Sequence, residues 1–212
     1  AQSGGGAVWA VGGNQEGQLG DGTTLTHTIP VAALGAGASG VVAVAAGAYH
    51  SLFLLADGSL WAMGDNTYGQ LGDGSTIDRH DPVAVVGAGT SGVIAVEAGH
   101  YHSIFLKNDG SLWAMGRNIE GQLGDGTNTS RTVPVAVLGA GASAVTKVSA
   151  GPEYCHFIRT DGSLWGMGRN EDGRLGDGTT THQNAPVRVL GAGTSGVVAV
   201  SSGGGAHTHF LK

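Results

Sequence analysis

Charged side chains, cysteines and long apolar runs are all scarce in this sequence, and each scarcity excludes a class of protein. Lysine, arginine, aspartate and glutamate make up only 12% of the 212 residues, and the formal net charge is −6. A chain with so few bases lacks the positive surface that binds a phosphate backbone, so no nucleic-acid partner is expected. The single cysteine, Cys155, excludes an intrachain disulfide and a metal site of paired cysteines. No apolar run reaches the length of about 18 residues that a membrane-spanning helix needs, so no membrane partner is expected either.

Glycine, in contrast, is abundant, with 41 residues in a chain that has five prolines. This content without a Gly-X-Y period excludes a collagen-like chain, and an apolar fraction of 41% argues against disorder. The charge is unevenly placed, because residues 1–106 hold one base and eight acids whereas residues 107–212 hold nine bases and eight acids. The two parts of the molecule are therefore expected to present different surfaces.

A repeat of 52 residues organises the chain, as its four tryptophans show: Trp9, Trp61, Trp113 and Trp165. Each copy contains four short apolar runs separated by glycine-rich turns, and no run is long and periodic enough for a helix. Four short antiparallel strands in a repeat of this length are typical of one blade of a β-propeller. The sequence therefore predicts an all-β propeller of four-stranded antiparallel blades. It forms a single domain over residues 1–212, with residues 1–6 as a flexible lead-in.

The chain starts and stops at different points of the repeat. Trp9 lies in the third strand of a unit, whereas the segment 208–212 is the second strand of another. Pairing of the last strand with the first would complete a fourth blade and leave no free edge. We therefore expect a ring of four blades closed by the N- and C-terminal strands. The alternative is that these strands pair between chains, which would give a two-chain ring of eight blades or a head-to-tail fibre.

Four motifs recur in the repeat, and one copy carries them in the segments Gly99–Leu106, Asp109–Trp113, Gly116–Gly126 and Pro134-Val135. They read G-x-Y-H-S-x-x-L, D-G-S-L-W, G-x-N-x-x-G-Q-L-G-x-G and P-V. This pattern resembles the regulator of chromosome condensation repeat, and nearly the whole chain carries it. The resemblance implies a propeller, typically of seven blades, that binds other macromolecules.

Two departures from the family pattern limit what the resemblance implies. Four copies are present, and the tryptophan that usually precedes the last glycine of the third strand is replaced by Val11, Met63, Met115 and Met167. The founding member exchanges guanine nucleotides and binds chromatin. No insertion in this chain could act as the wedge that engages such a partner, so exchange activity is not expected. The near identity of the copies looks like bacterial members of the family.

The nine histidines are the candidates for metal binding. His50, His102 and His156 fall at or near one position of the repeat, and His207 and His209 would share a strand face. Around a ring such residues could hold a divalent metal. We favour a structural role, in which they tie a strand to a neighbouring turn. The Asp-Gly loops lack the alternating ligands of a calcium site, so neither a metal nor another cofactor is predicted.

Enzymatic activity is not expected, and no catalytic residue is assigned. Serine, histidine and aspartate occur in every copy, whereas a catalytic site needs one asymmetric cluster with tuned pKa values. Cys155 occupies the position of Ser51 and Ser103 in the repeat. It is interpreted as a small, half-buried thiol without a chemical role.

Binding residues are sought where the copies differ, because variable loop tips above a constant frame form a binding surface. One position after the third strand changes between aspartate and arginine, a second between tyrosine and an acid, and a glutamine becomes an arginine in the last copy. The predicted partner-binding residues are Tyr49, Asp65, Tyr68, Tyr101, His102, Arg117, Glu120, Tyr154, Arg169, Asp172 and Arg174.

We therefore predict a non-enzymatic, secreted propeller that acts as a protein-binding or structural scaffold module. The start at Ala1 without methionine and the low lysine content favour secretion, and an extracellular bacterial location is expected. One alternative is a metal-dependent binder or enzyme that uses the histidine-bearing face. Another is a self-assembling unit. The expected partner is a protein or a second copy of the chain, and not a nucleic acid or a membrane.

Overall fold

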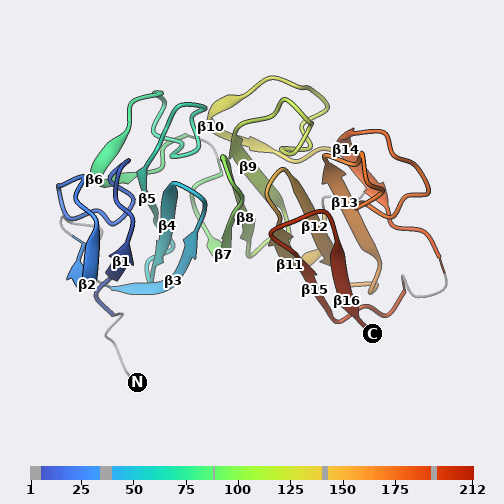
Figure 1. Ribbon diagram of the computed structural model, residues 1–212. Helices are drawn as coiled ribbons and strands as arrows, with labels where there is room; N and C mark the ends of the chain where they lie inside the picture. Colours follow the sequence, from blue (N-terminus) through green and yellow to red (C-terminus); the bar gives the residue numbers. More distant parts are fainter. Residues whose placement is uncertain (1–5, 34–39, 88, 140–142, 192–194) are drawn as a thin grey trace.

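The computed structural model describes residues 6–33, 40–87, 89–139, 143–191 and 195–212, and all regular secondary structure in them is β-strand (Figure 1). The expected flexible lead-in lies outside these residues except for Gly6, which forms an isolated antiparallel bridge with Val41. No helix in the described ranges has the length and apolar character needed to cross a bilayer. The predicted all-β fold is confirmed.

The strands form five antiparallel sheets, of which three are complete blades. The first blade contains β3 (Val41–Ala46), β4 (His50–Leu55), β5 (Leu60–Gly64) and β6 (Arg79–Ala84). The second contains β7 (Val93–Ala98), β8 (His102–Lys107), β9 (Leu112–Gly116) and β10 (Arg131–Ala136). The third contains β11 (Val145–Ala150), β12 (Tyr154–Arg159), β13 (Leu164–Gly168) and β14 (Gln183–Arg188). Within each blade the four strands pair in chain order, as predicted.

The remaining strands form two half-blades at the ends of the chain. β1 (Trp9–Gly12) pairs with β2 (His27–Ala32), and β15 (Ala199–Ser202) pairs with β16 (Thr208–Leu211). By their place in the repeat, β1 and β2 are the third and fourth strands of a blade, whereas β15 and β16 are the first and second. The four copies of the repeat thus make three whole blades and two complementary halves.

The expected closure of a four-bladed ring is not formed, because β1 and β16 belong to separate sheets. The blades stand side by side in an arc, with β1 and β2 at one end and β15 and β16 at the other (Figure 1). The reason is that packing between neighbouring blades, such as that of Met63 on Gly20 and of Met115 on Gly72, sets the rotation from one blade to the next. Four such rotations do not bring the two ends together.

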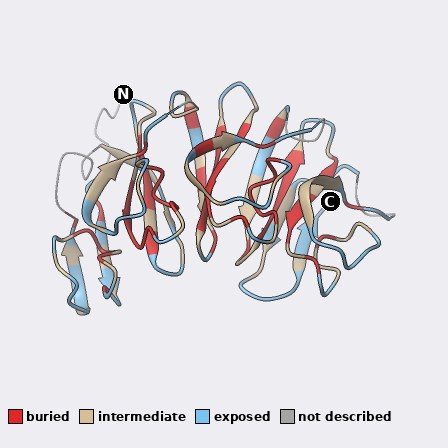
Figure 2. Cartoon of the chain, turned by 90° about the horizontal axis from the view of Figure 1, so that it is seen from above, coloured by how far each residue is buried: buried red, intermediate tan, exposed pale blue. Residues whose placement is uncertain are grey.

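The hydrophobic core lies between the blades as well as within them. Phe105 of β8 is fully buried and belongs to one cluster with Leu52 and Leu54 of the preceding blade. Phe157 of β12 repeats this arrangement against Ile104 in the next cluster. Burial of one such side chain contributes about 1.5–3 kcal/mol. Figure 2 shows the buried residues concentrated in the middle strands, while the residues of β1, β2, β15 and β16 at the ends of the arc are intermediate or exposed.

A methionine from each blade fits against a glycine of the preceding blade. Gly72 has φ +66°, and a Cβ atom added to it would lie 2.3 Å from Sδ of Met115. Met63 packs in the same way against Gly20. The glycine is therefore required twice, for its positive φ and for its lack of a side chain. The methionines that depart from the family pattern thus pack against the glycine loops of neighbouring blades.

Candidate functional site

A buried histidine joins neighbouring blades, and this joint accounts for two of the candidate metal ligands. His50 Nε2 lies 3.0 Å from Ser103 Oγ, and His102 Nε2 lies 3.1 Å from Cys155 Sγ in the following blade. Burial lowers the pKa of His50 to about 4 and that of His102 to about 3. Both imidazoles are therefore neutral at pH 7. The structural role is as expected, except that the partner is a strand residue and not a turn.

The third copy departs from this arrangement. The pairing of Phe157 with Trp165 matches that of Phe53 with Trp61, so Tyr154 and not His156 takes the position of His50. The Tyr154 hydroxyl donates to the backbone carbonyl of His207 at 2.8 Å. In the described part of the chain, no group of three or more histidine, cysteine, aspartate or glutamate residues is placed to hold a metal ion.

Most of the predicted binding residues lie together on one surface. This surface is at the end of the blades where the first strand turns into the second. Here the residue that precedes the second strand accepts a backbone hydrogen bond from the residue that follows the third strand. Asp65 N–H donates to Tyr49 at 2.9 Å, and Arg117 N–H donates to Tyr101 at 2.8 Å. These pairs line up from blade to blade. We call the resulting surface the tyrosine–arginine face, and its members are Glu16, Tyr49, Asp65, Tyr68, Tyr101, Arg117, Glu120, Glu153 and Arg169.

Three tyrosines form the centre of the tyrosine–arginine face. The rings of Tyr49 and Tyr101 stack with centroids 5.9 Å apart, and Tyr68 meets Tyr101 edge-on at 5.5 Å. Tyr49 leaves 42% of its surface exposed. The Arg117 guanidinium lies over the Tyr68 ring, 5.8 Å from its centroid, where a cation is attracted to the π electrons. The rings line an open hollow of about 540 Å³ together with Glu16 and Asp65. Asp65 is largely buried, and its carboxylate accepts hydrogen bonds from the backbone N–H and the hydroxyl of Thr67.

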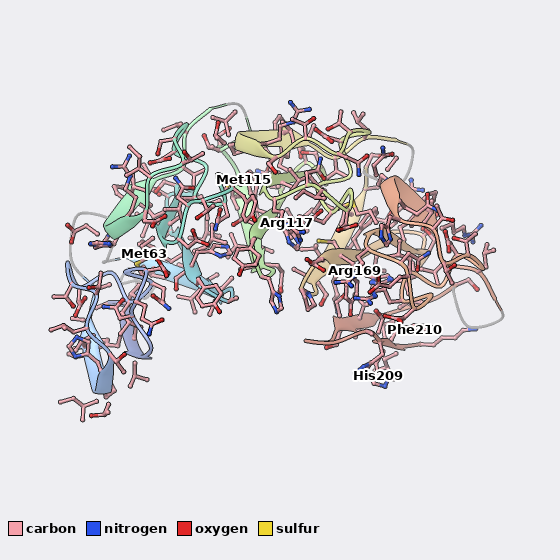
Figure 3. The ribbon with its side chains drawn as sticks, turned by 45° about the horizontal axis from the view of Figure 1, so that its top comes forward. Met63, Met115, Arg117, Arg169, His209 and Phe210 are labelled. Atoms are coloured by element: carbon pink, nitrogen blue, oxygen red, sulfur yellow. The ribbon has the colours of Figure 1, made fainter. Side chains whose placement is uncertain are left out.

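Arginines from two blades share one carboxylate at the edge of this hollow. Glu153 forms ion pairs with both Arg117 and Arg169, which come from neighbouring blades (Figure 3). Burial works to raise the pKa of Glu153, but the hydrogen bond from Arg169 and the charge of Arg117 outweigh it and lower the pKa. Arg117 also lies 3.8 Å from Glu120. Carboxylates of this chain therefore neutralise the charges of both arginines. Glu16 and Asp65, in contrast, form no ion pair with any described residue.

The remaining candidates lie elsewhere, and two of them need correction. Arg174 forms an ion pair with Asp172, and its guanidinium lies 5.5 Å from the Tyr154 ring centroid, next to the end half-blade. His102 and Tyr154 are fully buried in the joints between blades. They were expected at the binding surface, and this is wrong, because their side chains point into the neighbouring blade and not to solvent.

Two members of the tyrosine–arginine face, Glu16 and Glu153, were not among the predicted residues. Glu153 stands 52 residues after Tyr101, so it occupies the same position of the repeat, and Glu16 stands 52 residues before Tyr68. Both residues could have been predicted from the sequence, because each occupies the same position of the repeat as a predicted tyrosine.

Comparison with known proteins agrees with the repeat and the fold. The family model described as the regulator of chromosome condensation (RCC1) repeat matches residues 5–54, 57–106, 109–158 and 161–211. The chain belongs to the RCC1 repeat family. These four matches follow the 52-residue period and together span almost the whole chain.

Two relatives show how widely the RCC1 repeat is used. The chain is 33% identical over 198 residues to the ultraviolet-B receptor UVR8 of Arabidopsis thaliana, which covers 93% of this chain and 45% of that protein. It is 30% identical over 212 residues to the human E3 ubiquitin-protein ligase HERC2, covering 97% of this chain and 4% of that protein. The chain thus spans less than half the length of these relatives, and their activities belong to the whole proteins.

Solved structures of RCC1 relatives have the same arrangement of blades. Human WBSCR16 superposes with a TM-score of 0.81 at 28% identity, over 92% of this chain and 52% of that one. Prp20p from Saccharomyces cerevisiae, studied for its binding to Gsp1p and histones, superposes with a TM-score of 0.80 at 23% identity. The latter likeness shows the fold alone. This chain therefore corresponds to about half the length of each superposed structure.

Proposed function

We propose that this chain is a non-enzymatic protein-binding scaffold module and that the tyrosine–arginine face is its binding surface. The observation that carries the proposal is the stacked pair Tyr49 and Tyr101 beside Tyr68 and Arg117, around an open hollow of about 540 Å³. Tyrosine and arginine are enriched among the residues that dominate protein–protein binding energy, and such residues gather at the centre of an interface.

The charges around the hollow indicate what a partner would supply. Arg117 and Arg169 already have carboxylate partners within the chain, so they offer little to an incoming acid. Glu16 and Asp65 border the hollow without a cationic partner among the described residues. A lysine or arginine of the partner would be attracted both by the Glu16 carboxylate and by the tyrosine rings that line the same hollow.

The position of the face on the scaffold supports the same function. Tyr49, Asp65, Tyr101 and Arg117 each adjoin the end of a strand, and the backbone bonds from Asp65 to Tyr49 and from Arg117 to Tyr101 hold these positions. A surface held in this way loses little conformational freedom on binding. Location in a bacterial extracellular space stays a prediction, which cell fractionation with an antibody to the chain would test.

The experiment compares captured partners from the native source with three immobilised proteins: the wild type, a Tyr49→Ala/Tyr68→Ala variant, and an Ile29→Ala control. Ile29 lies on the outer strand β2 and is 71% exposed, so its change probes a different surface. A partner that binds the wild type and the control but not the tyrosine variant supports the proposal. A partner that binds all three equally well places the binding surface elsewhere.

A further inference from the structure

The position that follows the third strand of each complete blade is held in the same way but carries different side chains. It is Asp65 in the first blade, Arg117 in the second and Arg169 in the third. In all three blades its backbone N–H donates to the residue before the second strand, at 2.9, 2.8 and 2.9 Å. The three side chains therefore start from equivalent backbone positions, and they differ in how far they reach.

The surroundings of Arg117 show what this position contacts when it holds an arginine. Its guanidinium lies over the ring of Tyr68 in the preceding blade, 5.8 Å from the ring centroid. It also lies 3.8 Å from Glu120 of its own blade and forms an ion pair with Glu153 of the following blade. One aromatic ring and two carboxylates thus hold the arginine, and its side chain is only 16% exposed.

The same surroundings exist one repeat earlier, but no arginine fills them. Counting back 52 residues from the three partners of Arg117 gives Glu16, Tyr68 and Tyr101. These three residues and Asp65 all line the open hollow of about 540 Å³. The Asp65 carboxylate is short and is held by Thr67 next to it in the chain. The hollow therefore corresponds to the space that Arg117 occupies one blade further on.

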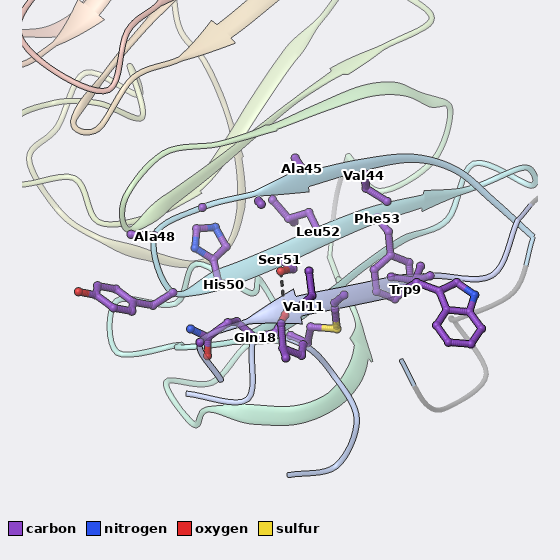
Figure 4. Close-up of a pocket in the computed structure, with 18 of the residues that line it drawn as sticks. Trp9, Val11, Gln18, Val44, Ala45, Ala48, His50, Ser51, Leu52 and Phe53 are labelled. Carbon is purple, nitrogen blue, oxygen red and sulfur yellow. Dashed lines mark hydrogen bonds between the residues drawn. The ribbon is translucent and has the colours of Figure 1, made fainter. Parts of the chain in front are cut away.

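The loop that carries Glu16 is placed like the loop that carries Tyr68, although it belongs to a half-blade. The Ser51 hydroxyl donates to the carbonyl of Gln18 at 2.9 Å (Figure 4), and the corresponding bond one blade further on is 2.7 Å. The N–H of Glu16 donates to the side chain of Gln18 at 3.0 Å, and the corresponding bond of Tyr68 is 2.9 Å. The repeat register thus holds in the structure, and Glu16 stands to the first blade as Tyr68 stands to the second.

We propose that this hollow binds an arginine side chain of the partner protein, whose guanidinium takes the place that Arg117 fills in the next blade. The inference rests on the proposed function, since the hollow belongs to the tyrosine–arginine face. The guanidinium would lie against the rings of Tyr68 and Tyr101 and pair with the carboxylate of Glu16. Asp65 supplies a second carboxylate, of which Oδ2 accepts no hydrogen bond from a described residue.

The chemistry of the hollow favours a guanidinium over an ammonium group. A guanidinium is planar, so it stacks on a tyrosine ring while its edge donates to a carboxylate, as Arg117 does with Tyr68 and Glu153. An ammonium group is a compact and strongly hydrated charge that cannot make both contacts in this way. Glu16 and Asp65 form no ion pair with a described residue, so two negative charges are left for the partner to neutralise.

NMR titration of the whole chain with three blocked tripeptides tests the identity of the ligand. Each probe has glycine on both sides of a central arginine, lysine or citrulline, and citrulline keeps the shape of arginine without its charge. At low ionic strength the arginine peptide should shift the ring signals of Tyr68 and Tyr101 and bind most tightly, whereas the citrulline peptide should shift none. An arginine peptide that causes no shift, or that binds no more tightly than the lysine peptide, would overturn the proposal.

An Asp65→Arg variant fills the hollow from within the chain. Its affinity for the arginine peptide should fall by about tenfold or more, because the new side chain occupies the site and repels the ligand. Circular dichroism should be unchanged, since two other blades carry arginine at the same backbone position. The matched control, Asp81→Arg, makes the same charge change at an exposed residue of β6 and should leave the affinity nearly unchanged. Equal losses in the two variants would assign the effect to net charge and overturn the site.

A second variant, Glu16→Gln, removes one carboxylate without filling the hollow. It should also weaken binding of the arginine peptide, while an unchanged affinity would contradict the role given to Glu16.

The capture experiment separates this inference from the proposed function. A partner that is lost from the Tyr49→Ala/Tyr68→Ala variant but still binds Asp65→Arg would keep the face as the binding surface and overturn the arginine site. A partner that is lost from both variants and retained by Asp81→Arg supports the two proposals together. An arginine peptide that binds in the hollow while captured partners ignore the tyrosine variant would support the site and contradict the proposed function.

Discussion

The imidazole Nε2 of His50 lies 3.0 Å from the hydroxyl oxygen of Ser103, and this contact crosses from one blade to the next. His102 makes the same contact with Cys155, one blade further on. Both imidazoles are buried. The histidine that makes the repeat recognisable in the sequence is thus a structural link, and the variable residues that bear on binding stand beside it on the tyrosine–arginine face.

Replacement of His50 by alanine should weaken the link between the first two blades. It removes a buried hydrogen bond and leaves a cavity, so the free energy of unfolding should fall by about 1–3 kcal/mol. Urea unfolding followed by tryptophan fluorescence measures the change. His100→Ala is the control, because His100 is exposed and should change stability little. Equal losses in both variants would contradict the role assigned to His50.

The buried histidines should make the protein less stable in mild acid. Burial lowers the pKa of His50 from 6.5 to about 4, so the unfolded chain binds a proton in a range where the folded chain does not. The stabilisation is complete above pH 6.5 and is lost progressively as the pH falls toward 4. Urea unfolding at pH 7, 5.5 and 4.5 should show this decline. A His50→Gln/His102→Gln variant, which cannot titrate there, should show a shallower one, and an unchanged slope would refute the assignment.

Gly72→Ala should destabilise the chain through the neighbouring blade. The substitution places a Cβ 2.3 Å from Sδ of Met115 at a φ of +66°. Strain at such a position costs of order 1–3 kcal/mol, and the clash adds to it. Gly139→Ala is the matched control, because Gly139 has φ +89° but no atom of a described residue lies within 4 Å of the added Cβ. Met115→Ala should relieve part of the Gly72→Ala loss in thermal denaturation, and the absence of any relief would argue against the contact.

Cys155 should be unreactive in the folded chain. Its side chain is fully buried, and burial, together with the nearby charge of Glu97, raises the pKa of the thiol far above its ordinary value. A chromogenic disulfide reagent at pH 8 should modify it only after urea is added. Rapid modification without urea would show that the joint between the second and third blades opens readily. The expected half-buried thiol is therefore fully buried.

Much of the tyrosine–arginine face could be predicted, because the repeat register places Asp65 and Arg117 at one position and Tyr49 and Tyr101 at another. What the register alone does not show is that Arg117 extends over Tyr68 of the preceding blade and reaches Glu153 of the following one. Such contacts depend on how neighbouring blades are oriented. The burial of His102 and Tyr154 was missed for the same reason.

The sequence by itself determined the blade: the tryptophan period, the glycine turns and the alternation of strands within 52 residues are local features, and local hydrogen bonding and turn chemistry follow from them. Only the tertiary structure decided that the arc stays open and which side chains meet across the joints between blades. The rotation between blades is a sum of contacts such as Met115 on Gly72 and His50 on Ser103, which join residues about 50 positions apart. No local sequence pattern specifies the rotation between neighbouring blades.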